Sequence, residues 1–157
     1  MRIWSKVLIP VLPTKQLKSM RYELGDMIKQ HPNIKHPLVK FSNNYDVMFL
    51  YLYFMEVCKE MDNRNINMNR SYNDSISNLV CSKTRSGENY QFNEDNRDYL
   101  NICYWNLYEK YLRKIITYEE WKKIEDSLIP LVDFEPPVID SKLIIDMMKN
   151  GNKDLII

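Results

Sequence analysis

Apolar residues recur at steps of three and four in the first third of the chain. After Pro13 they form one helical stripe, consisting of Leu17, Met20, Leu24, Met27 and Ile28. This spacing predicts an amphipathic helix with Thr14 as its N-cap and with Pro32 as its stop. A connecting loop is expected over residues 31–37. Residues 44–61 are apolar on nearly every side and too long for a strand, which predicts a central buried helix.

The second half of the chain alternates polar stretches with shorter helical patterns. Residues 63–93 are rich in Asn and Ser and predict a long loop with one short helix around residues 75–81. Residues 95–114 repeat apolar and aromatic positions near i+4, which predicts a further helix. The sequence T-x-x-E from Thr117 to Glu120 is a capping box that starts a helix running to about residue 128.

Prolines follow this last helix and bound an extended segment. Asp140 or Ser141 can then cap a short C-terminal helix that runs through Lys149. No internal repeat is present. The patterns therefore predict an all-α fold over residues 1–157, organised as one compact domain with a core over residues 1–130 and a C-terminal extension over residues 131–157.

Composition fits this interpretation. The 157 residues amount to 19.0 kDa, the size of one domain, and 45% hydrophobic residues can form a packed core. Three cysteines without a CxxC pair are typical of reduced thiols inside a cell. The longest apolar stretch is shorter than the roughly 20 residues that a membrane span needs. We therefore expect a cytoplasmic protein that does not enter a membrane.

Charge is divided unevenly along the chain. Residues 1–40 hold eight Lys and Arg against Glu23 and Asp26, a balance of +6, and the remaining residues hold fourteen against nineteen, a balance of −5. Such a separation is typical of a protein with one face for an anion such as nucleic-acid phosphate. The alternative is that folding mixes the two halves and no patch forms.

The absence of several sequence motifs argues against several kinds of functional site. Only three glycines are present, and neither GxGxxG nor GKS/T occurs, which argues against a phosphate loop. Ser-His-Asp, HExxH and Cys/His ligand spacings are also missing. His31 and His36 lie in a loop without nearby Cys or paired carboxylates, which makes a poor metal site. We expect neither a metal nor a cofactor, and we expect the tyrosines and tryptophans to serve mainly in the core.

The first 24 residues carry a more specific signal. They contain the sequences Arg2-Ile3-Trp4, Leu8-Ile9-Pro10, Leu12-Pro13, Gln16-Leu17 and Glu23-Leu24. This region resembles the N-terminal region of the pyrimidine-dimer DNA glycosylase family, the small all-helical "endonuclease V" enzymes of phages and their bacterial relatives. The bacterial branch opens with M-R-[LI]-W and continues through LIPxLPxxQL. Residues 98–126 look compatible with the family but carry less specific motifs.

The resemblance implies a catalytic pair. Members of the family use the α-amine of the chain as the nucleophile on the sugar C1′, beside a glutamate on the first helix. By this likeness Met1 would supply the amine, because the arginine that follows the nucleophile falls on Arg2, and Glu23 falls on the glutamate. An α-amine has a pKa of about 7.7–8.0, so a useful fraction is neutral at pH 7. Glu23 also lies at the edge of the apolar stripe, although an ordinary solvated carboxylate would fit there too.

The implied activity is that of a DNA glycosylase with AP-lyase activity, and the implied partner is double-stranded DNA with a damaged or modified base. DNA contacts would then fall to basic residues of the first helix and the loop after it, with ordinary solvated residues as the alternative. These residues are Arg2, Lys18, Arg21, His31, Lys35 and His36. Two features depart from the family: Tyr22 stands where an arginine is usual, and the short phage enzyme lacks residues 63–93 and the tail beyond residue 130.

Two other functions stay open. One is a non-catalytic protein of a phage or mobile element that binds nucleic acid, a nucleotide or a host protein on the same scaffold. The other is an enzyme that hydrolyses the glycosidic bond of free nucleotides, which would keep Glu23 but show no salt-dependent affinity for DNA. The α-amine discriminates among them, because only the glycosylase needs it free and next to Glu23. The sequence indicates neither the lesion nor the oligomeric state.

Overall fold

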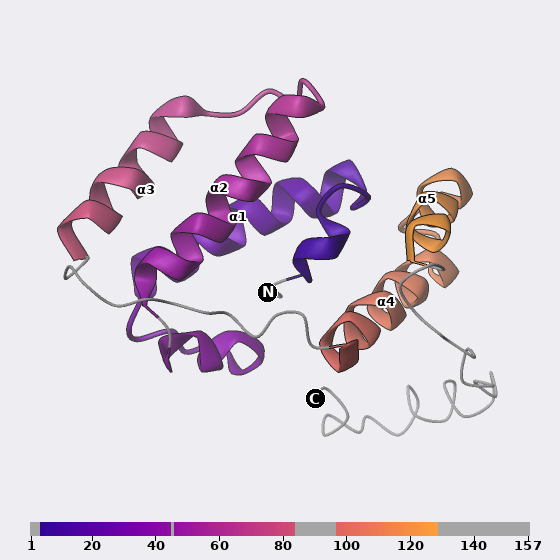
Figure 1. Cartoon of the computed structure of the whole chain (residues 1–157), viewed down its shortest axis with the longest axis horizontal. Coiled ribbons are helices and arrows are strands. Elements are labelled where there is room, and N and C mark those ends of the chain that lie inside the picture. The colour runs from indigo at the N-terminus through magenta and orange to yellow at the C-terminus, as the bar shows by residue number, and fades with distance from the viewer. Residues whose placement is uncertain (1–3, 45, 84–96, 129–157) are drawn as a thin grey trace.

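The computed structural model describes residues 4–44, 46–83 and 97–128, and all regular elements among them are helical (Figure 1). The elements are two 3-10 helices and five α-helices: η1 Lys6–Leu8, α1 Thr14–Gln30, η2 Pro37–Asn44, α2 Val47–Asn63, α3 Arg70–Lys83, α4 Arg97–Leu112 and α5 Tyr118–Leu128. The predicted all-α class is confirmed. None of the described helices is long and apolar enough to cross a membrane.

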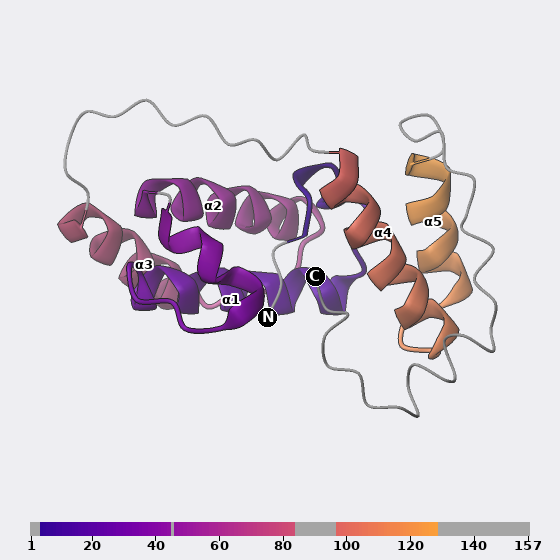
Figure 2. The same ribbon diagram turned by 90° about the horizontal axis from the view of Figure 1, so that it is seen from below.

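Helices α1 and α2 form the centre of the fold. They share the most extensive helix contact, and α3 packs against both of them. The pair α4 and α5 lies on the other side of the N-terminal segment, where the two helices pack against each other (Figure 2). One cluster of buried apolar side chains includes residues of η1 and of all five α-helices. Burial of this shared cluster is the main term that holds the helices together.

The two central helices agree with the apolar pattern, with one correction at a cap. Thr14 was predicted as the N-cap of α1, but Pro13 holds that position and its carbonyl accepts a hydrogen bond from the Leu17 N–H at 3.0 Å. Pro has a fixed φ near −65° and needs no donor of its own, so it can precede the first turn. At the start of α2, the Asp46 carboxylate accepts the Met48 N–H at 2.6 Å and caps the helix.

The Asn-rich segment is more helical than predicted. In place of a long loop with a short helix over residues 75–81, α3 occupies fourteen residues. Ile76 and Val80, one turn apart, are fully buried against the core, and Asn69 caps the helix by accepting the Tyr72 N–H at 3.1 Å. Tertiary packing therefore outweighs the weak helix propensity of Asn and Ser.

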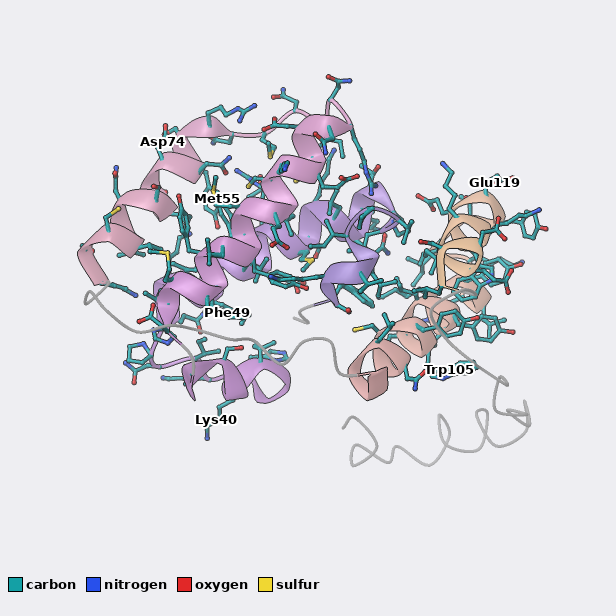
Figure 3. The ribbon with its side chains drawn as sticks, in the orientation of Figure 1. Lys40, Phe49, Met55, Asp74, Trp105 and Glu119 are labelled. Atoms are coloured by element: carbon teal, nitrogen blue, oxygen red, sulfur yellow. The ribbon has the colours of Figure 1, made fainter. Side chains whose placement is uncertain are left out.

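The capping box of α5 is confirmed. The Thr117 N–H donates to Glu120 Oε2 at 3.0 Å, and the Glu120 N–H donates to Thr117 Oγ1 at 3.3 Å. Trp121 is buried between α5 and α4, with its ring centroid 5.1 Å from that of Tyr108. Trp105, like Tyr108, lies on α4, and its side chain is partly exposed (Figure 3). The predicted C-terminal extension over residues 131–157, with its short helix, lies outside the described residues.

Candidate functional site

Glu23 lies at the border between the core and solvent. On α1 the buried side chains Met20, Leu24 and Met27 flank it on one side, while Glu23 itself is half-buried. One turn earlier, the Ser19 hydroxyl donates a hydrogen bond to Glu23 Oε1 at 3.0 Å. A carboxylate oriented in this way can accept a proton or stabilise a positive charge.

The N-terminal segment is fixed to α2. Trp4 is buried, and its carbonyl accepts a hydrogen bond from the hydroxyl of the buried Tyr53 on α2. Ser5 and Leu8 are buried as well. The segment thus has its first anchor at Trp4, only three residues after the chain start.

A second anchor lies at the C-terminal end of α2, where Arg64 is the C-cap residue. The guanidinium of Arg64 donates to the carbonyls of Ile9 at 3.0 Å, Pro10 at 2.7 Å and Leu12 at 2.6 Å. The Glu60 carboxylate accepts from the same guanidinium at 2.7 Å and balances its charge. Together the two anchors hold the backbone of residues 4–12, which leads into α1. Neither Tyr53 nor Arg64 stands out in the sequence, because both act on backbone groups about fifty residues away.

Met1 and Arg2 lie outside the described residues. The role of the Met1 α-amine therefore stays a prediction.

The exposed face of α1 is basic. Lys15, Lys18 and Lys29 recur at spacings that bring them to one side of the helix, and all three are exposed. Asp26 lies on the same side and forms an exposed ion pair with Lys29 at 3.3 Å. Of the predicted DNA contacts, Lys18 belongs to this face, which we call the basic face of α1 and define by Lys15, Lys18 and Lys29.

Three more of the predicted contacts, His31, Lys35 and His36, lie after the end of α1. Lys35 is exposed, and His31 and His36 are partly exposed. The carbonyl of His31 accepts a hydrogen bond from Lys83 Nζ at 2.9 Å, and this lysine also caps carbonyls at the end of α1. Among the described residues, no group of three or more His, Cys, Asp or Glu side chains could hold a metal ion.

Arg21 has a different environment from the other predicted DNA contacts. Its side chain is 1% exposed. The guanidinium Nε donates to Asn73 Oδ1 at 3.0 Å and a terminal nitrogen donates to the Asn69 carbonyl at 2.9 Å, so the residue links α1 to α3. Its contact with DNA stays a prediction that this placement does not support. Two residues of the Asn-rich segment supply the oxygens that make burial of the charge tolerable.

Aromatic rings surround the buried guanidinium. Arg21 Cζ lies 4.9 Å from the ring centroid of Tyr72 and 5.0 Å from that of Tyr22. Burial raises the pKa of the Tyr72 hydroxyl, while the positive charge of Lys29 opposes the shift. Burial likewise raises the pKa of the Cys58 thiol, against the opposing effect of Arg21. Both groups are therefore neutral at pH 7.

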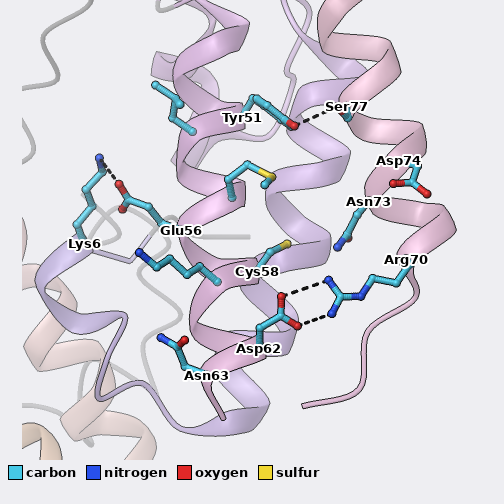
Figure 4. A pocket seen from close by; sticks show the side chains of 13 residues that line it. Lys6, Tyr51, Glu56, Cys58, Asp62, Asn63, Arg70, Asn73, Asp74 and Ser77 are labelled. Carbon is cyan, nitrogen blue, oxygen red and sulfur yellow. Dashed lines mark hydrogen bonds and ion pairs between the residues drawn. The ribbon is translucent and has the colours of Figure 1, made fainter. Parts of the chain in front are cut away.

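A groove of about 690 Å³ lies between α2 and α3 and has Cys58 in its lining (Figure 4). Two contacts cross it. Arg70 and Asp62 form an ion pair at 2.6 Å, and the Tyr51 hydroxyl hydrogen-bonds to Ser77 Oγ at 3.0 Å. These contacts fix α3 on α2, and through α3 they hold the asparagines that bind Arg21.

Comparison with known proteins bears on the first half of the chain. A family model described as pyrimidine dimer DNA glycosylase matches residues 1–74. No curated protein and no solved structure matches the chain significantly. The matched residues include Glu23, the anchored N-terminal segment and the basic face of α1. They end within α3, before α4 and α5.

Proposed function

We propose that the protein is a DNA glycosylase with AP-lyase activity, in which the α-amine of Met1 is the nucleophile and Glu23 is the acid/base and charge-stabilising group. The observation that carries the proposal is the family match over residues 1–74, which covers both elements of this pair. The half-buried position of Glu23 and the anchor at Trp4 support it.

The reaction balances with these two groups. The neutral amine attacks C1′, the bond between C1′ and the base breaks, and the base leaves with a proton. The amine nitrogen loses one proton, the C1′–O4′ bond of the sugar then breaks as O4′ takes up a proton, and the resulting iminium at C1′ keeps the other proton of the amine. Removal of a C2′ proton then expels the 3′ phosphate by β-elimination. Glu23 accepts protons in these steps and stabilises the positive charge that develops on the sugar.

Orientation of the nucleophile falls to the anchors. Correct placement of reacting groups contributes strongly to rate. The hydrogen bond from Tyr53 fixes the Trp4 backbone, three residues after Met1, on α2. Ser19 similarly holds the carboxylate of Glu23.

Binding of duplex DNA falls to the basic face of α1 and to the other predicted contacts Arg2, His31, Lys35 and His36. Each phosphate that these groups neutralise releases counterions and makes the affinity depend on salt. Arg21 is not part of this surface, because its guanidinium is buried between α1 and α3.

The experiment compares Glu23→Gln with Asp26→Asn, an exposed carboxylate three residues later on the same helix. The substrates are duplexes with a pyrimidine dimer or an abasic site. We expect Glu23→Gln to lower strand cleavage by roughly 10²- to 10⁴-fold with little loss of binding, and Asp26→Asn to cleave normally. Equal cleavage by wild type and Glu23→Gln would contradict the role of Glu23. Binding without cleavage by the wild type would favour the non-catalytic alternative, and hydrolysis of free nucleotides without salt-dependent DNA affinity would favour the third.

A further inference from the structure

An exposed tyrosine stands in the middle of the basic face of α1. The side chain of Tyr22 is 50% exposed. Lys18 lies one turn before Tyr22, about 6 Å away along the helix axis. Lys15 lies two turns before Tyr22 and Lys29 two turns after it, each about 10.5 Å away along the axis. Asp26 is the acidic residue that α1 contributes to this side, so the three lysines leave the basic face with a net positive charge.

The ring of Tyr22 rests on a rigid support. Its centroid lies 5.4 Å from that of Tyr72, at an interplanar angle of 53°, and the buried Arg21 guanidinium lies 5.0 Å from it. Tyr72 in turn contacts the fully buried Phe54 at 6.4 Å between centroids. The support therefore continues from the surface into the core. A ring held in this way loses little side-chain entropy when a ligand covers its outer face.

We propose that Tyr22 stacks on an unpaired nucleobase of the bound DNA. The inference rests on the proposed function for its ligand and names a contact of the same site. A flat apolar ring in a field of lysines matches a nucleic-acid strand, which offers aromatic bases beside anionic phosphates. In an intact duplex both faces of each base are stacked on neighbours. The partner must therefore be a base that has left the stack, at or opposite the lesion.

The test uses a duplex with one unpaired 2-aminopurine opposite a tetrahydrofuran analogue of an abasic site, which lacks the C1′ hydroxyl and is not cleaved by an AP lyase. Affinity is measured by fluorescence anisotropy at several KCl concentrations for Tyr22→Ala and Tyr22→Phe. Tyr118→Ala is the matched control, since Tyr118 is 59% exposed and lies on α5. We expect Tyr22→Ala to weaken binding roughly 5- to 150-fold, and Tyr22→Phe and Tyr118→Ala to bind within about twofold of the wild type.

Salt dependence separates stacking from charge. Tyr22→Ala should leave the slope of log affinity against log salt unchanged, whereas Lys18→Ala should reduce it by about 0.7–0.9. The 2-aminopurine fluorescence should be higher in the Tyr22→Ala complex than in the wild-type complex, because the stacked ring quenches it. Thermal unfolding followed by circular dichroism verifies that each variant is folded.

The proposal is overturned if Tyr22→Ala binds as tightly as the wild type, or if Tyr22→Phe loses as much affinity as Tyr22→Ala. Its failure is distinguishable from failure of the proposed function. A wild-type protein that forms a covalent adduct with abasic DNA while Tyr22→Ala binds normally contradicts only the stacking contact. A wild-type protein that forms no adduct while Tyr22→Ala loses affinity contradicts only the glycosylase. Absence of any DNA binding by the wild type contradicts both.

Discussion

The support beneath Tyr22 gives a prediction about Gly25, a glycine within α1. A Cβ atom added at Gly25 would lie 2.1 Å from Tyr72 Oη and 2.9 Å from Tyr72 Cζ. Tyr72 would therefore have to move. Its ring is confined by Tyr22 at 5.4 Å, by Phe54 at 6.4 Å and by Lys29 Nζ at 4.6 Å from the ring centroid, so its displacement disrupts these contacts.

Two opposing terms set the magnitude for Gly25→Ala. In a helix interior, replacement of Gly by Ala normally stabilises by about 0.8–1 kcal/mol. Overpacking costs about 1–3 kcal/mol, and a displaced aromatic contact costs about 0.5–1.5 kcal/mol. We expect the free energy of unfolding to fall by about 1 kcal/mol or more.

Urea denaturation followed by circular dichroism measures this change, and a double-mutant cycle tests its cause. In the background of Tyr72→Ala the obstacle is gone, so Gly25→Ala should stabilise by about 0.8–1 kcal/mol. The sign of the effect thus reverses between the two backgrounds, with a coupling energy of about 2 kcal/mol. Equal stabilisation by Gly25→Ala in both backgrounds would refute the contact between Gly25 and Tyr72.

Three further predictions follow from the described contacts. Arg21→Lys should lower the free energy of unfolding by about 1.5–3 kcal/mol in urea melts, because an ammonium cannot replace the hydrogen bonds of the guanidinium to both Asn69 and Asn73. Lys18→Ala, the control, should change the free energy of unfolding by less than about 0.5 kcal/mol. Tyr53→Phe should slow covalent trapping on abasic DNA by roughly 10- to 100-fold while stability falls by only about 0.5–1.5 kcal/mol; an unchanged trapping rate would contradict a positioning role. Because the pKa values of Cys58 and Tyr72 are raised, the folded protein retains protons that the unfolded chain loses above about pH 9 and pH 10. The free energy of unfolding that these two groups contribute should therefore be fully present below pH 9 and should decline at higher pH. Urea midpoints that rise between pH 8 and pH 10.5 would contradict this expectation.

The helices could be predicted where a local pattern determines them. The stripe on α1 and the capping box of α5 depend on residues three or four positions apart, and both are confirmed. The length of α3 could not be predicted, because Ile76 and Val80 gain their stability from contacts with helices elsewhere in the chain. Local propensity is a weak guide where tertiary burial decides.

The candidate site likewise has features that the sequence predicts and features that depend on contacts between distant residues. The position of Glu23 at the edge of the apolar stripe follows from helical geometry. Burial of Arg21 does not, since its partners Asn69 and Asn73 lie about fifty residues away and carry no charge that would mark them. The support of Tyr22 by Tyr72 also depends on this pairing of α1 with α3. An arginine followed by a tyrosine on one helix gives no sign of which of them reaches the surface.

The most direct test of the central claim is covalent trapping. The untagged protein, with its native Met1 amine, is incubated with abasic duplex DNA and borohydride, and the adduct is mapped by mass spectrometry. We predict an adduct on the Met1 α-amine that disappears when this amine is acetylated. Absence of an adduct from a protein with a free N-terminus, or an adduct on a lysine side chain, would contradict it.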